Sequence, residues 1–213
     1  MSELRLTVVR VQDVAPAVKC LTLRGAGAVE LPDFSAGAHI NVTLPDGDER
    51  SYSLVDLGRR VANEYQLAVR LDEDGTGGSR FMHGLQAGDV VTCQPPQNDF
   101  PLRSSDKPPL LIAGGIGVTP ITGMLAALKG KGFDFHYAGR AADALAFVPE
   151  LRELAAAQMH LHFDGTDSAL DLDAIFQGFE SMRPVYVCGP KGMIEAVKAA
   201  KSLKNFYQNT VHC

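Results

Sequence analysis

Cysteine is scarce in this chain of 213 residues, and its four copies, Cys20, Cys93, Cys188 and Cys213, are widely scattered. They form no C-x-x-C pair, which argues against a disulfide framework and a zinc site and favours reduced thiols. No stretch approaches the roughly 18 apolar residues that span a bilayer, and the charged N-terminus lacks the apolar core of a signal peptide. We therefore predict a cytoplasmic protein that has no membrane partner.

An excess of positive charge is absent as well. The formal net charge of -5 at pH 7 argues against a broad basic surface for nucleic acid. The motif G-x-S-x-G of serine hydrolases does not occur. His160 and His162 share a predicted strand face, but no H-E-x-x-H motif or cysteine pair accompanies them, so we predict packing roles and no metal site.

What the chain does contain is typical of a soluble protein with two domains. Hydrophobic residues make up 46% and charged residues 21% of the sequence, which is close to the average for globular proteins. In the first hundred residues, short runs with a period of two are separated by turn residues, and this pattern predicts an antiparallel Greek-key β-barrel. The runs cover residues 4–12, 17–25, 38–47, 50–57, 64–75 and 89–96, and a short helix with Ser79 as its N-cap interrupts them.

The second half alternates strands and helices after the proline-rich segment 101–109. This rhythm requires crossover connections and predicts an α/β domain with a parallel sheet of about five strands. We place the domains at residues 1–103 and 104–213. The predicted strands cover 110–113, 133–140, 159–164, 185–190 and 208–213, and the predicted helices cover 121–130, 144–158, 170–179 and 192–203.

The glycine-rich stretch LLIAGGIGVTPITGML, residues 110–125, joins the first of these strands to a helix. Thr119 is the expected N-cap, and Pro120 is the expected first helical residue. Gly114, Gly115 and Gly117 allow the backbone to approach an anion closely at the positive end of a helix. The pattern is neither G-x-G-x-x-G nor a Walker motif, so a phosphate cradle and a plain strand-to-helix turn both remain open.

Three further stretches each allow a functional and a structural interpretation. RSYSLVD, which begins at Arg50, places Arg50 and Tyr52 on one strand face, where they suit either a phosphate with a planar ring or an ordinary ion pair. DEDGTGGSRFMH, which begins at Asp72, is either an anion-binding turn or a helix entry. VYVCGP, which begins at Val185, places Cys188 at a strand end, either facing a substrate or in the core.

The chain resembles the ferredoxin-NADP reductase superfamily, and most closely its phthalate dioxygenase reductase and vanillate demethylase reductase branch. Four motifs carry this resemblance, in this order along the chain: R-x-Y-S, G-G-S, G-G-I-G-V-T-P and C-G-P. FSAGAHINVTLPDG, PPQNDFPL and the terminal TVH are also similar to that branch. The resemblance covers essentially the whole chain. It implies a flavin, FMN before FAD, on the barrel and NADH on the α/β domain, with hydride transfer between the two rings.

The resemblance also implies a role for particular residues. Arg50 would bind the flavin phosphate, Tyr52 would pack on the isoalloxazine, and Ser53 would hydrogen-bond near flavin N5. Ser53 and Cys188 are the residues expected closest to the reaction. The turn around the ribityl phosphate is matched by Gly77, Gly78 and Ser79. The dinucleotide would be faced by Gly115, Gly117 and Thr119, and its nicotinamide would be bordered by Cys188, Gly189 and Pro190. The adenosine half would be contacted by Arg140 and Asp164.

Asp164 favours NADH over NADPH because a carboxylate suits a free 2′-hydroxyl. The spacing C-x4-C-x2-C of a plant-type [2Fe–2S] domain, which normally follows in that branch, does not occur. The iron–sulfur domain is therefore either a separate protein, a [2Fe–2S] ferredoxin or oxygenase component, or missing from this chain. An FAD-dependent reductase of free flavin or ferredoxin, and a non-catalytic nucleotide-binding module, remain as alternatives.

Overall fold

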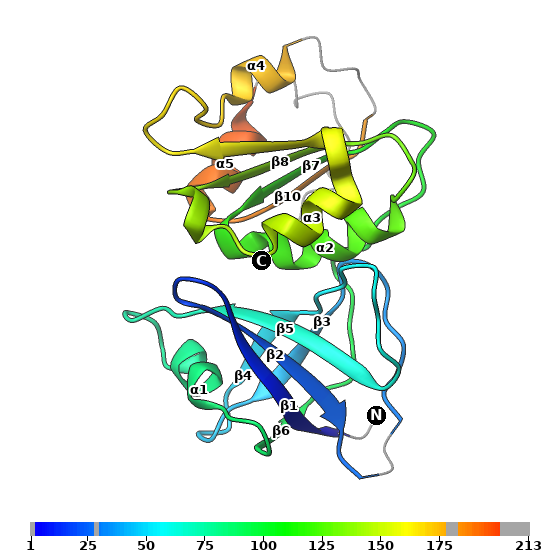
Figure 1. Ribbon diagram of the computed structural model, residues 1–213, viewed down its shortest axis with the longest axis vertical. Coiled ribbons are helices and arrows are strands. Elements are labelled where there is room, and N and C mark those ends of the chain that lie inside the picture. The colour runs from blue at the N-terminus through cyan, green and yellow to red at the C-terminus, as the bar shows by residue number, and fades with distance from the viewer. Residues whose placement is uncertain (1–2, 28–29, 178–182, 201–213) are drawn as a thin grey trace.

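The computed structural model describes residues 3–27, 30–177 and 183–200. An antiparallel barrel precedes an α/β unit along the chain, and the two are stacked on each other (Figure 1). This arrangement confirms the predicted order of fold classes. Within the described residues, no helix combines the length and the apolar character that crossing a membrane requires.

The barrel is a sheet with the spatial order β4-β3-β6-β1-β2-β5. Adjacent hairpins β1–β2 and β3–β4 are joined by β6, which pairs with both β1 and β3, and this gives the predicted Greek-key arrangement. An antiparallel bridge between Leu54 and Leu67 brings the exit of β4 to β5 and helps to close the barrel. The strands are β1 (Leu4–Ala15), β2 (Val18–Gly25), β3 (His39–Thr43), β4 (Glu49–Ser53), β5 (Glu64–Arg70) and β6 (Val90–Cys93), and the helix α1 (Gly78–Gly84) lies between β5 and β6.

The α/β unit has a parallel sheet with the order β10-β7-β8-β9. Helices α2 and α3 lie between this sheet and the barrel (Figure 1). The chain moves from β7 outward to β9 and then returns to the other side of β7, so the order reverses between β7 and β10. Ligands of open α/β sheets bind at such a reversal, outside the carboxyl ends of the strands. The elements are β7 (Leu110–Gly114), α2 (Val118–Ala127), β8 (Asp134–Gly139), α3 (Val148–Ala155), β9 (Met159–Phe163), α4 (Leu172–Phe176), β10 (Val185–Cys188) and α5 (Lys191–Ala199), with short 3₁₀ turns at Gly115–Gly117, Ala142–Ala144 and Ala156–Gln158.

One predicted helix is partly wrong. The helix expected over 144–158 begins only at Val148, because Phe147 has a left-handed backbone with φ of 62° and buries its ring. Pro149 then lies in the first turn, where its missing N–H costs nothing. The strand predicted over 208–213 lies outside the described residues.

The hydrophobic core does not stop at the predicted domain boundary. One continuous cluster of buried side chains holds the sheet and helices of the α/β unit together with Val18, Cys20, Val55, Ala68 and Phe100 of the first 103 residues. The connecting segment is also attached, because Tyr186 of β10 lies 5.7 Å from the Phe100 ring and accepts the Arg103 N–H at 2.9 Å. The barrel therefore packs against the α/β unit through apolar contacts.

Candidate functional site

Strand β4 carries the predicted flavin side chains at one end of the barrel. Arg50 donates to Asp48 Oδ2 at 3.1 Å and to Thr76 Oγ1 at 3.1 Å, so its guanidinium points toward the loop before α1. Tyr52 is half-buried on the same strand face, as predicted, and burial raises its pKa while the charge of Arg50 opposes that shift. Ser53 is the last residue of β4 to pair with β3.

The glycine-rich entry to α1 packs directly on these side chains. A Cβ atom on Gly78 would lie 2.9 Å from Arg50 Cγ and 3.2 Å from Tyr52 Oη, so only glycine leaves both side chains in place. The predicted serine N-cap is wrong, because Gly77 occupies that position with φ of 102°, which a serine would resist. The Ser79 hydroxyl instead accepts the Asp72 N–H at 3.0 Å and so fixes the preceding loop.

In the α/β unit, the glycine turn leaves β7 as a single 3₁₀ turn over Gly115–Gly117 that runs straight into α2. The helix starts at Val118, so Thr119 is not its N-cap. The Val118 N–H is already satisfied by carbonyl groups of this turn, and the Thr119 hydroxyl donates to Ile116 O at 3.0 Å. The buried Thr119 side chain thus holds the turn against the first turn of α2.

The second glycine turn meets the first at the carboxyl ends of β10 and β7. A Cβ on Gly117 would lie 2.4 Å from Cys188 O, and one on Gly189 would lie 3.0 Å from Gly114 Cα. The turn that follows β7 and the turn that follows β10 therefore lie so close together that neither Gly117 nor Gly189 can carry a side chain. Cys188 is buried at the end of β10, with 1% of its surface exposed.

These segments from both units enclose one cleft of about 320 Å³. Eight of the predicted site residues line it: Arg50, Tyr52, Ser53, Gly78, Ser79, Gly117, Thr119 and Cys188. Residues separated by more than a hundred positions in the chain are thus brought to one surface. Ser53 lines the same cleft as Arg50 and Tyr52 although strand alternation places it on the other face, and Ser51, which shares the face of Ser53, lines the cleft as well.

The other predicted residues lie outside the lining of this cleft. Gly77, Gly115, Gly189 and Pro190 belong to the turns that shape it. Arg140 and Asp164 are exposed and directly follow β8 and β9, where the Asp164 N–H donates to Gly139 O at 3.1 Å. They are neighbours at the carboxyl edge of the sheet, where β8 and β9 lie one and two strands beyond β7.

Sequence reasoning missed several residues of the cleft. Asp72, Gly75 and Thr76 belong to the glycine-rich stretch already singled out, so their composition was a usable signal. The end of β5 gave no signal, because its apolar alternation is that of any barrel strand. The lining residues that were not predicted are Ser51, Ala68, Val69, Arg70, Asp72, Gly75, Thr76 and Ile116.

The histidines of β8 and β9 form a separate group. His136 stacks on His160 and His162 with ring centroids 4.9 and 5.1 Å apart, and its Nδ1 lies 2.9 Å from His162 Nε2. Burial and the neighbouring imidazoles lower the pKa of His136 to about 4. Within the described part of the chain, no three His, Cys, Asp or Glu side chains are grouped so that they would hold a metal ion.

Comparison with known proteins assigns the α/β unit first. Residues 111–199 match the family described as "Oxidoreductase NAD-binding domain". The chain is 40% identical to tetrachlorobenzoquinone reductase of Sphingobium chlorophenolicum over 94% of its own length and 64% of that protein. It is 36% identical to the carnitine monooxygenase reductase subunit of Escherichia coli over all of its own length and 69% of that subunit. The chain thus spans about two thirds of the length of these relatives.

A solved structure extends the match to both units. Phthalate dioxygenase reductase, described as a modular structure for electron transfer from pyridine nucleotides to [2Fe–2S], superposes with a TM-score of 0.84 and 31% identity, over 99% of this chain and 67% of that one. The predicted resemblance is therefore confirmed. This chain belongs to the family of ferredoxin reductase-like oxidoreductases that contains phthalate dioxygenase reductase and vanillate O-demethylase oxidoreductase.

Proposed function

We propose that this chain is a flavin-dependent NADH oxidoreductase that passes electrons from NADH through bound FMN to an iron–sulfur protein. Its place would be the reductase component of a Rieske-type oxygenase or demethylase system. The observation that carries the proposal is a cleft in which β4 and α1 of the barrel face the two glycine turns of the α/β unit. Membership of a reductase family supports NAD(H) and a flavin as the cofactors.

The barrel side of the cleft suits a flavin mononucleotide. Its charged lining residues are Arg50 and Arg70 against Asp72, an excess of positive charge that favours a phosphate. Arg50 would bind this phosphate together with the turn of Gly77, Gly78 and Ser79. The half-buried Tyr52 ring would pack along the isoalloxazine, and the Ser53 hydroxyl would hydrogen-bond near flavin N5.

The α/β side of the cleft suits the nicotinamide. Gly115, Gly117 and Thr119 would contact the dinucleotide, and Cys188, Gly189 and Pro190 would border the nicotinamide ring. A flavin held by Arg50 and Tyr52 would supply a hydride acceptor for NADH and a donor of single electrons to an iron–sulfur partner. The residues of the chain position the two rings and exclude water, and this requires no strong general acid or base.

The adenosine half would lie farther along the sheet edge, at Arg140 and Asp164. The exposed Asp164 carboxylate accepts hydrogen bonds from ribose hydroxyls and repels a 2′-phosphate, so we propose NADH as the preferred donor. Asp164→Asn should raise the kcat/KM for NADPH relative to that for NADH, with Asp167→Asn on the same exposed loop as the control. An unchanged ratio would remove Asp164 from this role.

Two further assignments belong to the proposal. The flavin unit would comprise residues 1–103 and the nicotinamide unit 104–213, a boundary that falls in the loop between β6 and β7. A cytoplasmic location agrees with Cys20 and Cys93, which are buried and form no disulfide.

The first experiment is a visible spectrum of the purified protein, followed by NADH without oxygen. Flavin bands that bleach on addition of NADH would support the reductase, and release of the cofactor by heat would distinguish FMN from FAD. Subsequent reoxidation by an added [2Fe–2S] ferredoxin would test the electron acceptor. A protein that stays colourless and unreactive after reconstitution with FMN or FAD would refute the enzyme and favour a non-catalytic module.

A further inference from the structure

A buried hydrogen bond joins the two segments that carry the candidate site. β4 ends at Ser53, and three residues later the N–H of Asp56 donates to Thr122 Oγ1 of α2 at 3.0 Å. The Thr122 hydroxyl in turn donates to Thr119 O at 2.7 Å. Thr122 is 0% exposed and Asp56 is 8% exposed, so water does not compete for this contact.

Both residues of this contact are close in sequence to residues that line the cleft. Asp56 follows Ser53 by three positions, and Thr122 follows Thr119 by three positions in the first turns of α2. Because Thr119 also holds Ile116 O, the hydrogen bonds continue into the turn that faces the cleft. The contact therefore links the barrel wall of the cleft to its α/β wall.

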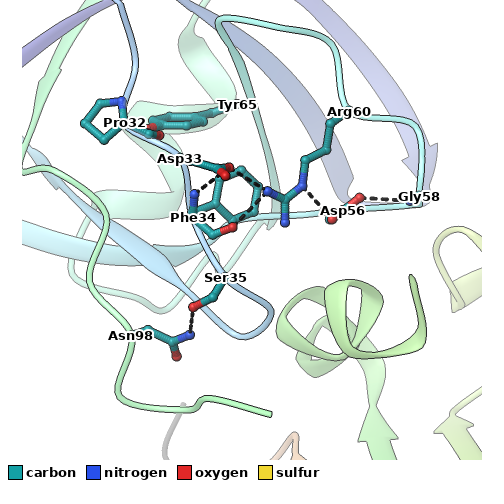
Figure 2. A network of polar contacts seen from close by, with 9 residues as sticks. All are labelled: Pro32, Asp33, Phe34, Ser35, Asp56, Gly58, Arg60, Tyr65 and Asn98. Atoms are coloured by element: carbon teal, nitrogen blue, oxygen red, sulfur yellow. Dashed lines mark hydrogen bonds and ion pairs between the residues drawn. The ribbon is translucent and has the colours of Figure 1, made fainter. Parts of the chain in front are cut away.

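Arg60 fixes the barrel end of this link (Figure 2). Its Nε donates to Asp56 Oδ2 at 2.6 Å, and its Nη1 donates to Asp33 Oδ1 at 2.9 Å and to Phe34 O at 2.8 Å. The guanidinium also lies 3.9 Å from the centroid of the Phe34 ring. The other carboxylate oxygen, Asp56 Oδ1, accepts the Gly58 N–H at 2.8 Å. Charge-assisted bonds of this kind are about twice as strong as neutral ones, so the Asp56 loop is held to the segment at Asp33 and Phe34.

Backbone packing independently limits how α2 can move on the barrel. A Cβ on Gly123 would lie 3.3 Å from Ala36 Cα and 3.7 Å from Asp56 Cβ, so α2 approaches the barrel at near-contact distance. Ala36 is itself held, because its carbonyl accepts from Asn98 Nδ2 at 3.0 Å. Glycine in a helix interior is less stable than alanine, and at this position it permits the close approach.

We propose that Asp56, Arg60 and Thr122 are positioning residues that set the spacing between the two walls of the cleft. Their effect on hydride transfer rests on the proposed function above. Transfer requires reacting atoms about 3–3.5 Å apart, and a misplacement of about 1 Å can cost about 100-fold in rate. None of the three lines the cleft described above, so they act through the segments they hold.

The test replaces the hydroxyl that makes the contact. Thr122→Val keeps the shape of the side chain but removes the acceptor for Asp56 and the donor to Thr119, whereas Thr122→Ser restores both. We expect Thr122→Val to slow anaerobic flavin reduction by NADH at least 10-fold. It should also weaken the charge-transfer absorbance between the nicotinamide and flavin rings, while the affinity for FMN stays within twofold of wild type. Thr122→Ser should recover the wild-type rate to within about threefold.

Two other variants distinguish a positioning role from a general weakening of the contact between the two units. Arg60→Met removes the anchor of Asp56 at a partly exposed position, and it should slow flavin reduction in the same direction even if Thr122→Val fails to fold. Arg59→Ala removes the exposed ion pair between the barrel and Glu153 of α3, and it should leave the rate unchanged. Wild-type rates in both Thr122→Val and Arg60→Met would overturn the proposal.

A distance measurement without substrate keeps this inference separate from the proposed function. Spin labels at Arg5→Cys in β1 and Arg152→Cys in α3, both exposed, report the spacing of the two units, with Cys213 replaced by Ser to avoid extra labelling. We expect a broader or shifted distribution in Thr122→Val than in Thr122→Ser. If NADH does not reduce even the wild-type flavin, the proposed function fails, and an unchanged distribution alone would still refute the positioning role.

Discussion

Gly117 offers the sharpest test of the site, because the atoms around it are backbone. A Cβ there would lie 2.4 Å from Cys188 O, 2.5 Å from Cys188 C and 2.6 Å from Gly189 N, whereas ordinary contact begins at 3.4 Å. The distance from the Cβ of Gly117→Ala to Cys188 O is therefore about 1 Å shorter than an ordinary contact. No side-chain rotation relieves this overlap, so the glycine turn and the end of β10 must move apart.

The displacement sets the expected size of the effect. Overpacking of this kind costs about 1–3 kcal/mol of stability, and for a chain of this size that lowers Tm by roughly 2–12 °C. A shift of about 1 Å between the residues that we propose to hold the nicotinamide corresponds to about 100-fold in rate. As a loss of transition-state stabilisation, that is about 2.7 kcal/mol in kcat/KM for NADH.

The assay is NADH-dependent reduction of the bound flavin, measured together with thermal unfolding. Gly132→Ala is the matched control, because its Cβ would meet only Pro108 Cβ, at an ordinary 3.6 Å, at the other edge of the sheet. The control should retain wild-type kinetics and Tm within about 2 °C. A Gly117→Ala protein with kcat/KM within twofold of wild type would contradict the close-packed turns.

Three further predictions concern the flavin side and the histidine group. Arg50→Ala should weaken flavin binding by about 10- to 100-fold, because hydrogen bonds to charged groups contribute about 1.5–3 kcal/mol; fluorescence titration would measure it, and an unchanged Kd would exclude a phosphate role. Gly78→Ala, which crowds Arg50 Cγ and Tyr52 Oη, should weaken flavin binding roughly 10-fold, whereas Gly84→Ala in the same helix has no atom within 4 Å of its Cβ and should not. The lowered pKa of His136, about 4 against 6.5, means that the unfolded chain binds more protons between these values, so stability should fall as the pH drops from 6.5 toward 4. At pH 5 the loss is at most about 2 kcal/mol and is reduced by partial exposure. His136→Phe should flatten this dependence in urea titrations at pH 7 and pH 5, and an unaltered slope would show that His136 is not its source.

Local patterns were sufficient wherever local chemistry decides the structure. The period-two runs and the glycine turns located every described strand, because alternation and turn residues act within a few positions. The helix starts were less accurate. A 3₁₀ turn over Gly115–Gly117 satisfies the backbone that Thr119 was expected to cap, and Phe147 gains burial by leaving the helical conformation. Both outcomes depend on tertiary contacts that no short window contains.

The cleft itself was predictable only in part. Arg50, Tyr52 and Cys188 stand in short motifs, so their chemistry was visible in the sequence. The contact between Asp56 and Thr122 depends on how the barrel meets α2, and its two partners are separated by 66 positions. Such contacts leave no periodic signal, so the structure was needed to find them.

The core cluster that crosses the domain boundary also has a consequence for unfolding. Val55, Ala68 and Phe100 are buried together with the interior of the α/β unit. Separating the chain near residue 103 would therefore expose apolar surface on both pieces. The barrel also has a buried cluster of its own, which includes Leu6, Leu23 and Ile40, so the shared apolar surface couples the unfolding of the two units without supplying the whole interior of the barrel.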